Sequence, residues 1–120
     1  MKALVCNEPG SFDYVERERP EIQPGRAILK VKRIGICGTD LHAFEGTQPY
    51  FVYPRILGHE LGCEIVQVDS STDFEVGERV TLIPYFHCGE CIACRNGLPN
   101  CCAAINVFGV HVDGGMMEYI

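Results

Sequence analysis

Four cysteines lie close together in the chain at a spacing that suits a metal ion. They are Cys88, Cys91, Cys94 and Cys102, within the stretch HCGECIACRNGLPNCC. Zinc takes four soft ligands at tetrahedral corners about 2.3 Å away, and a Cys-x-x-Cys turn brings two sulfurs to such distances without strain. A run of evenly spaced cysteines with a fourth on the returning segment therefore predicts a zinc site.

Other interpretations of this cysteine-rich stretch stay open. An iron–sulfur cluster is the competing metal site, and a reduced loop without metal or a chance disulfide is the third possibility. Cys101 adjoins Cys102, and adjacent residues seldom both bind one ion with good geometry, so one of the pair is spare. The segment from about 85 to 103 has too little apolar content to fold alone, so we expect the metal to stabilise it. We call residues 85–103 the four-cysteine lobe.

Three further segments carry residues that suit metal binding or proton transfer. They are GICGTDLH (35–42), GHELGCE (58–64) and the DGG sequence that begins at Asp113. Thiol, imidazole and carboxylate groups are the ligands that zinc takes in proteins. These segments are therefore candidates for a second site, separate from the four-cysteine lobe.

The order of these motifs resembles the zinc-dependent medium-chain alcohol dehydrogenases. Cys37-Gly38-Thr39-Asp40 with His42 comes first, then Gly58-His59-Glu60, then the four-cysteine lobe. The resemblance covers almost the whole chain and is to the N-terminal, GroES-like catalytic domain of the family. YPRILGHE and GVHVDGG are most similar to polyol, threonine and sugar-acid dehydrogenases. The sequence departs from the family pattern at Cys63, where glycine is usual.

The resemblance implies a catalytic zinc in this domain. Cys37 and His59 would bind it, with Glu60 as a ligand that can enter or leave. A thiolate, an imidazole and a carboxylate leave one coordination position open, which a catalytic zinc requires. Asp40 would accept a hydrogen bond from the imidazole of His59 and so fix its tautomer.

The resemblance also implies roles in proton transfer. Thr39 would take the proton of the zinc-bound alcohol, and His42 would pass it toward solvent. Zinc lowers the pKa of a bound hydroxyl, so an alkoxide can form near neutral pH and release hydride to a nicotinamide. Simpler roles exist as well, since Thr39 and Asp40 suit a helix cap and His42 suits an exposed helical position.

Short β-type runs separated by turns predict a mainly β fold, a GroES-like, partly open β-barrel with short helices. Strands are expected at Lys2–Cys6, Phe12–Arg17, Ala27–Ile36, Glu64–Asp69 and Arg79–Ile83. The first two form a hairpin, and the third changes phase at Arg33-Ile34, where a bulge would fit. A short helix is expected from Thr39 to Glu45, and Gly46 is expected to end it. Four aromatic residues are candidates for pocket walls, with core packing as the default: Tyr50, Phe51, Tyr85 and Phe86.

Composition argues against several classes of partner. The 120 residues carry a formal net charge of −6 without a dense basic patch, which disfavours a zinc-ribbon nucleic-acid module and anionic membrane surfaces. The chain has no apolar run of membrane-spanning length and no secretory signal. We therefore expect a cytoplasmic protein whose thiols stay reduced and bind metal.

We expect residues 1–120 to form one GroES-like catalytic domain. No two of the 13 glycines are separated by a single residue, so the Gly-x-Gly fingerprint of a nucleotide-binding Rossmann domain is absent from this sequence. The expected function is therefore that of the zinc-binding domain of a longer NAD(P)-dependent alcohol dehydrogenase. Such an enzyme would hold two zinc ions per chain, form a homo-oligomer, and oxidise a secondary alcohol of polyol, threonine or sugar-acid type. The domain alone would be inactive, and the alternative is a non-catalytic GroES-like scaffold module with a structural zinc.

Overall fold

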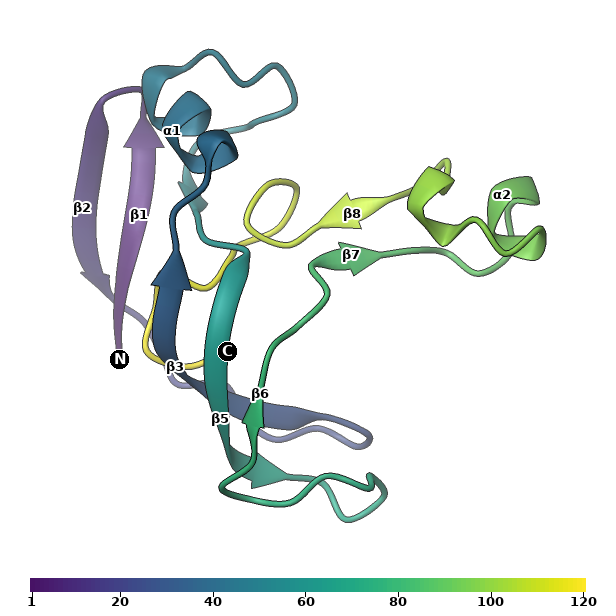
Figure 1. Ribbon diagram of the computed structural model, residues 1–120. Helices are drawn as coiled ribbons and strands as arrows, with labels where there is room; N and C mark the ends of the chain where they lie inside the picture. Colours follow the sequence, from purple (N-terminus) through teal and green to yellow (C-terminus); the bar gives the residue numbers. More distant parts are fainter.

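Three small β-sheets make up most of the structure (Figure 1), a computed structural model that describes residues 1–120. Their strand orders are β2-β1-β4, β3-β5-β6 and β7-β8. The strands are β1 (Lys2–Glu8), β2 (Ser11–Glu16), β3 (Ala27–Gly35), β4 (Arg55–Ile56), β5 (Glu60–Val68), β6 (Arg79–Val80), β7 (Tyr85–Phe86) and β8 (Asn106–Val107). The helical segments are α1 (Gly38–Glu45), α2 (Ile92–Arg95) and the 3-10 turn η1 (Pro99–Cys101). The expected mainly β class is confirmed, and no helix has the length and apolar character that a membrane span needs.

The expected opening hairpin is present, with β1 and β2 antiparallel and Lys2 opposite Glu16. The long strand β3 is also present and pairs with β5. One of its two register shifts lies between Val31 and Arg33, one residue before the expected bulge. Because such a shift changes which face each following side chain occupies, it explains the broken alternation in this strand.

Two strand boundaries differ from the expectation by three residues or more, and the others by two or fewer. Strand β5 begins at Glu60 rather than Glu64, because Glu60 and Leu61 already pair with the end of β3. Strand β6 ends at Val80 rather than Ile83, because only its first two residues pair with β5. The chain then runs on toward the third sheet, and the side chain of Ile83 is 80% exposed. The residues that follow Val80 have side chains that favour a strand, but no neighbouring strand pairs with them.

The final residues connect the first two sheets. The N–H of Leu4 in β1 donates to the carbonyl of Met116 (2.8 Å), and Leu29 in β3 exchanges two backbone hydrogen bonds with Ile120 (2.8 and 3.0 Å). Isolated bridges at Ala3 and Lys30 continue this pairing. The sheets are joined in this way without closing into a barrel.

Cys37 is the residue that caps α1. Its sulfur accepts a hydrogen bond from the N–H of Thr39 (3.3 Å), and its own N–H donates to Asp40 Oδ2 (3.1 Å). The expectation that Thr39 caps the helix is therefore wrong, because Thr39 already lies within the first turn. Asp40 supplies the carboxylate of the capping box. Gly46 ends the helix as expected, with φ of 77°.

The main core lies between the first sheet, α1 and the segment that precedes His59. Its buried members are Ala3, Val5, Cys6, Ala43, Phe51, Ile56, Leu57, Val110 and Met116. Phe12 of β2 stacks on Phe44 of α1 with ring centroids 5.1 Å apart, which joins the hairpin to the helix. Of the aromatic residues considered as pocket walls, Phe51 is in this core, whereas Tyr50 is 74% exposed.

Residues 113–116 lie directly against the segment 56–58. The N–H of Gly114 donates to the carbonyl of Ile56 (2.7 Å), that of Gly115 to Gly58 (2.7 Å) and that of Met116 to Leu57 (2.9 Å). A Cβ atom at Gly114 would overlap the carbonyl oxygens of Leu57 and Gly58. This close approach of two backbones is possible only because position 114 has no side chain.

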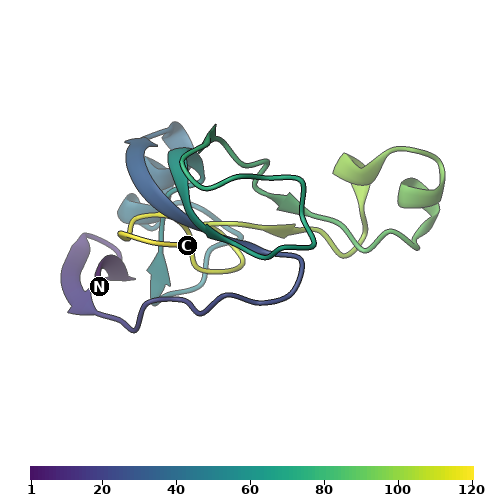
Figure 2. The ribbon, with the colours of Figure 1, turned by 90° about the horizontal axis from the view of Figure 1, so that it is seen from below.

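The four-cysteine lobe stands apart from the rest of the molecule. Strand β7, at the start of the lobe, pairs with β8, just after the lobe, and this two-stranded arm extends away from the other sheets, as the view from below also shows (Figure 2). Within residues 85–103 the only buried residue is Cys102. The lobe therefore has almost no apolar core of its own.

We predict that Gly114→Ala lowers the free energy of unfolding by about 1–3 kcal/mol, because the added Cβ would overlap backbone atoms that can shift only at a cost in stability. Gly62→Ala is the matched control, since a Cβ there meets only the Cβ of Arg33 at an ordinary 3.6 Å. The control should change stability by less than about 0.5 kcal/mol. Urea denaturation midpoints measure both, and equal midpoints for the two variants would contradict the packing argument.

Candidate metal centres

The four-cysteine lobe brings four sulfur atoms together at one point. The Sγ atoms of Cys88, Cys91, Cys94 and Cys102 all lie within 4.8 Å of one another. Those of Cys91 and Cys94 are 3.5 Å apart, as are those of Cys88 and Cys102. Ligands about 2.3 Å from a central zinc at tetrahedral corners lie about 3.8 Å apart. The sulfur positions therefore fit a single tetrahedral ion.

The same distances bear on the other interpretations of this stretch. All eight cysteines are free, and 3.5 Å is far longer than an S–S bond of about 2.0 Å. An iron–sulfur cluster holds several metal atoms and needs its ligands farther apart than one ion does. Cys101 is exposed and does not belong to the group of four sulfurs. Cys101 is thus the spare member of the adjacent pair.

Backbone donors surround the sulfurs and favour negative charge there. The N–H groups of Cys94 and Ala103 lower the pKa of Cys91 to about 6. The N–H of Cys88 donates to the sulfur of Cys102 (3.4 Å) and lowers the pKa of that thiol. Burial and the hydrogen bond with Cys91 raise the pKa of Cys94. The lobe thus favours the thiolate form at Cys91 and Cys102, which suits a cation between the sulfurs.

A second group of ligand atoms forms where α1 and β5 begin. Cys37 is the cap of α1 and His59 directly precedes β5. The distance between Cys37 Sγ and His59 Nε2 is 3.1 Å. These two residues are 22 positions apart in the chain, so only the tertiary fold brings them together. A soft sulfur and an imidazole nitrogen that converge in this way are a fitting pair of zinc ligands.

Asp40 lies behind this pair. It is 4% exposed, and its carboxylate accepts the N–H groups of Cys37 (3.1 Å) and Gly58 (3.2 Å). Its Oδ1 is 3.6 Å from His59 Nδ1, a buried atom that has no hydrogen-bond partner. A carboxylate facing Nδ1 leaves Nε2 as the nitrogen that can bind metal. Asp40 therefore faces the ring nitrogen of His59 opposite the one that lies beside Cys37.

An open pocket of about 650 Å³ lies over the Cys37–His59 pair. Its lining includes Thr39, Glu60 and Tyr85, all singled out in the sequence. Glu60 lines the pocket but is not in the cluster of ligand atoms, which consists of Cys37, Asp40 and His59. The structure thus places Glu60 near the other expected ligands without joining it to them.

His42 is not among the residues that line this pocket. Its Nδ1 lies 3.2 Å from Thr47 Oγ1 and 3.5 Å from Glu45 Oε2, and its side chain is 61% exposed. The structure thus places His42 on the outer side of α1, in contact with solvent.

Four further residues line the pocket and were not predicted from the sequence. They are Leu61, Thr81, Leu82 and Pro84. Thr81 and Leu82 fall in a run that read as a strand, and their apolar and hydroxyl side chains carry no motif. The one signal in the sequence was that this run lies close to Tyr85, with only Pro84 between them.

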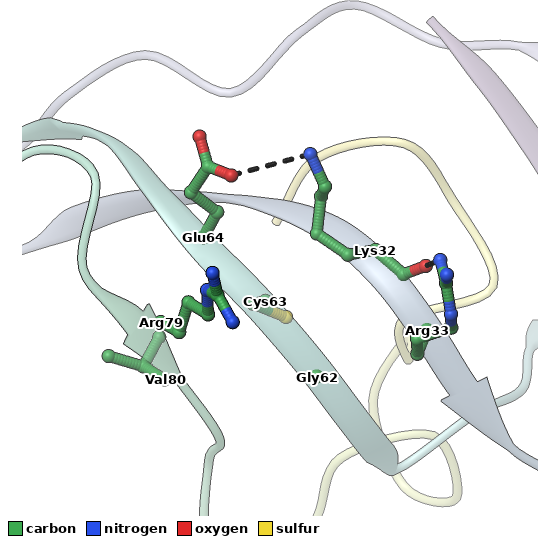
Figure 3. A pocket seen from close by; sticks show the side chains of 7 residues that line it. All are labelled: Lys32, Arg33, Gly62, Cys63, Glu64, Arg79 and Val80. Atoms are coloured by element: carbon green, nitrogen blue, oxygen red, sulfur yellow. Dashed lines mark hydrogen bonds and ion pairs between the residues drawn. The ribbon is translucent and has the colours of Figure 1, made fainter.

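A different pocket, of about 570 Å³, lies along β3, β5 and β6 (Figure 3). Its lining residues are Lys32, Arg33, Gly62, Cys63, Glu64, Arg79 and Val80. Lys32 and Glu64 form an ion pair across it (3.3 Å). Cys63, the departure from the family pattern, is 3% exposed, and burial raises the pKa of its thiol. Cys63 is therefore packed within the sheet as a neutral thiol, and this pocket contains none of the expected site residues.

Comparison with known proteins identifies the family. The family model described as "Alcohol dehydrogenase GroES-like domain" matches residues 23–120. The chain belongs to this family. A GroES-like domain of this kind agrees with the order of metal-ligand motifs and with the mainly β fold.

Three relatives show the range of proteins that this GroES-like domain resembles. It is 46% identical to an L-galactonate-5-dehydrogenase of Escherichia coli K12 and 40% identical to a sorbitol dehydrogenase of Halalkalibacterium halodurans; each match covers 100% of this chain and 36% of the relative. A short chain alcohol dehydrogenase from Escherichia coli CFT073, solved with the cofactor NADH, superposes with a TM-score of 0.89 at 41% identity. That match covers 100% of this chain and 35% of the solved one. The GroES-like domain thus spans about a third of the length of these relatives.

We predict that Cys91→Ser removes one zinc ion per chain and lowers the melting temperature by about 5 °C or more, because three ligands hold zinc poorly and the lobe has no apolar core. Cys101→Ser, at an exposed cysteine outside the group of four, is the matched control and should change neither quantity. Elemental analysis and thermal unfolding measure the two effects. An equal loss of zinc in both variants would exclude the assignment of ligands.

Proposed function

We propose that this chain is the zinc-binding domain of an NAD(P)-dependent alcohol dehydrogenase that oxidises secondary alcohols of polyol, threonine or sugar-acid type. The observation that carries the proposal is the convergence of Cys37 Sγ and His59 Nε2 (3.1 Å) beside an open pocket, with the Asp40 carboxylate behind the imidazole. The relatives described as L-galactonate-5-dehydrogenase and sorbitol dehydrogenase support the substrate class.

Two zinc ions are proposed for the domain. Cys37 and His59 would hold the first, with Glu60 entering or leaving from the pocket wall. The four-cysteine lobe would hold the second with all four thiolates. A site closed by four sulfurs has no position for substrate and is structural, whereas the first site keeps an open position. The structural role of one zinc ion and the catalytic role of the other thus follow from the number of protein ligands at each site.

When bound at the first site, zinc would polarise the hydroxyl of an alcohol and lower its pKa. Thr39 lines the same pocket, and its Oγ1 would accept the hydroxyl proton while its own hydroxyl proton leaves toward His42 and solvent. Asp40 would hold the imidazole of His59 in one tautomer, since its carboxylate is already fixed by two backbone N–H groups. His42, whose side chain is 61% exposed, would pass the proton on to solvent.

The pocket walls would orient the substrate. Leu61, Leu82 and Pro84 provide apolar contacts, and the hydroxyl groups of Thr81 and Tyr85 can hydrogen-bond a polyhydroxylated carbon chain. NAD or NADP would bind to a nucleotide-binding domain that these 120 residues do not contain. We accordingly propose that residues 1–120 are the catalytic domain and that turnover requires the longer protein.

The proposal also includes the cellular compartment and the partners of the protein. Eight free thiols suit a reducing compartment, which supports a cytoplasmic location. The expected partners are a small-molecule alcohol and further copies of the chain. The net charge of −6 gives no support for a nucleic-acid partner.

We predict that the full-length protein reduces NAD or NADP with a polyol or sugar acid, and that His59→Ala lowers kcat/KM by at least about 100-fold, because a metal ligand is lost. NAD(P)H absorbance across a panel of alcohols measures this effect. Removal of zinc by a chelator should abolish turnover, and added zinc should restore it.

The matched control is His87→Ala. His87 is exposed and lines none of the pockets described above. This variant should keep full activity and zinc content. Undiminished activity of His59→Ala, or the absence of turnover in a zinc-loaded protein over the whole panel, would refute the proposed function.

A further inference from the structure

Asp113 lies at the point where two distant segments of the chain join. Its Oδ1 accepts the N–H of Ile56 in β4 (3.1 Å), 57 residues away in the chain. The same oxygen is 3.6 Å from Nη1 of Arg55, whose side chain is 20% exposed. No other carboxylate forms an ion pair with Arg55 in the structure. The carboxylate of Asp113 is therefore held from two sides by β4.

The backbone that follows β4 leads directly to His59. Carbonyl groups of Ile56, Leu57 and Gly58 accept the N–H groups of the three residues that follow Asp113 (2.7–2.9 Å). The N–H of Gly58 donates to Asp40 (3.2 Å), and Gly58 has φ of 89°. The backbone immediately before the imidazole is thus clamped on one side by residues 113–116 and on the other by Asp40.

Among residues 113–116, Asp113 has the only side chain that forms a hydrogen bond or an ion pair with the segment 55–58. The other hydrogen bonds come from the backbone N–H groups of Gly114, Gly115 and Met116, and the side chain of Met116 packs in the core beside Leu57. The Asp113 carboxylate adds a hydrogen bond to Ile56 and an ion pair with Arg55 to these backbone pairings, so it strengthens the register that they define between the two segments. A shift of that register would move His59 relative to Cys37, whose capping position at α1 is set separately.

We propose that Asp113 is a positioning residue for the metal site at His59. It acts by holding the segment 55–58 so that Nε2 of His59 points to Cys37 Sγ. This inference rests on the proposed function, because it presumes that Cys37 and His59 bind a metal. Asp113 itself does not touch the pocket over that pair, so its effect is indirect.

The test uses cobalt(II) titration of the metal-free full-length protein, followed by visible absorption. The absorption band that is lost in His59→Ala defines the His59 site. Asp113→Ala should weaken cobalt binding at this site by about 10-fold or more and shift its band, as loss of a supporting partner does in other metal sites. Binding at the four-cysteine lobe should not change. Asp113→Asn keeps an oxygen that can accept the N–H of Ile56, and it should restore most of the affinity.

Asp69→Ala is the matched control. Asp69 also organises a loop, by accepting the N–H groups of Gly25 (3.0 Å) and Ser71 (3.1 Å), but it follows the far end of β5. This variant should lose stability without any change in cobalt affinity. If Asp113→Ala does not fold, Asp113→Glu replaces it, since this change keeps the charge and displaces the oxygen by one methylene; it should weaken the His59 site alone.

Two results would overturn the inference in different ways. Wild-type protein without a His59-dependent band would refute the proposed function, and the inference with it. A normal His59-dependent band whose cobalt affinity is the same in wild type, Asp69→Ala and the folded Asp113 variants would leave the proposed function standing and reduce Asp113 to a purely structural role.

Discussion

The buried carboxylate of Asp40 is the constraint on which the candidate site depends. Removing an ionised carboxylate from water is costly unless it is well hydrogen-bonded. Here it accepts N–H groups from Cys37 and Gly58, and hydrogen bonds to a charged acceptor contribute about 1.5–3 kcal/mol each. One donor belongs to the helix cap and the other to the turn before His59. Satisfying the charge therefore requires that these two segments meet, and their meeting brings the sulfur and the imidazole together.

The rest of the body supports this junction. The core packs β1 and α1 against the segment 56–57, and residues 113–116 cover the other side of that segment with backbone contacts too close for any side chain at position 114. The last residues then link β1 to β3. Rigid backbone on several sides is what a metal site needs, because ligand atoms must be held within a few tenths of an ångström before the ion arrives.

The four-cysteine lobe is stabilised differently from the site at Cys37 and His59. Its residues lie on an arm outside the core, and only Cys102 is buried. Such a segment has almost no hydrophobic burial with which to oppose chain entropy, so its order depends on the sulfur ligands. The two centres thus differ physically: in one the fold creates the ligand geometry, and in the other the ligands create the local fold.

The amino-acid sequence by itself determined the features that depend on local spacing. The four-cysteine lobe, the opening hairpin, the helix that Gly46 ends and the mainly β class all follow from neighbours a few residues apart, and the motifs at Cys37 and His59 identified the family. Only the tertiary structure decided that β6 stops at Val80, that Thr81, Leu82 and Pro84 line the pocket, and that Asp113 reaches Ile56. The two-residue strands β4, β7 and β8 are too short to show an alternation, and their existence depends on partners elsewhere in the chain. Contacts between residues far apart in sequence are set by how the sheets and the final segment pack, and no local pattern encodes that packing.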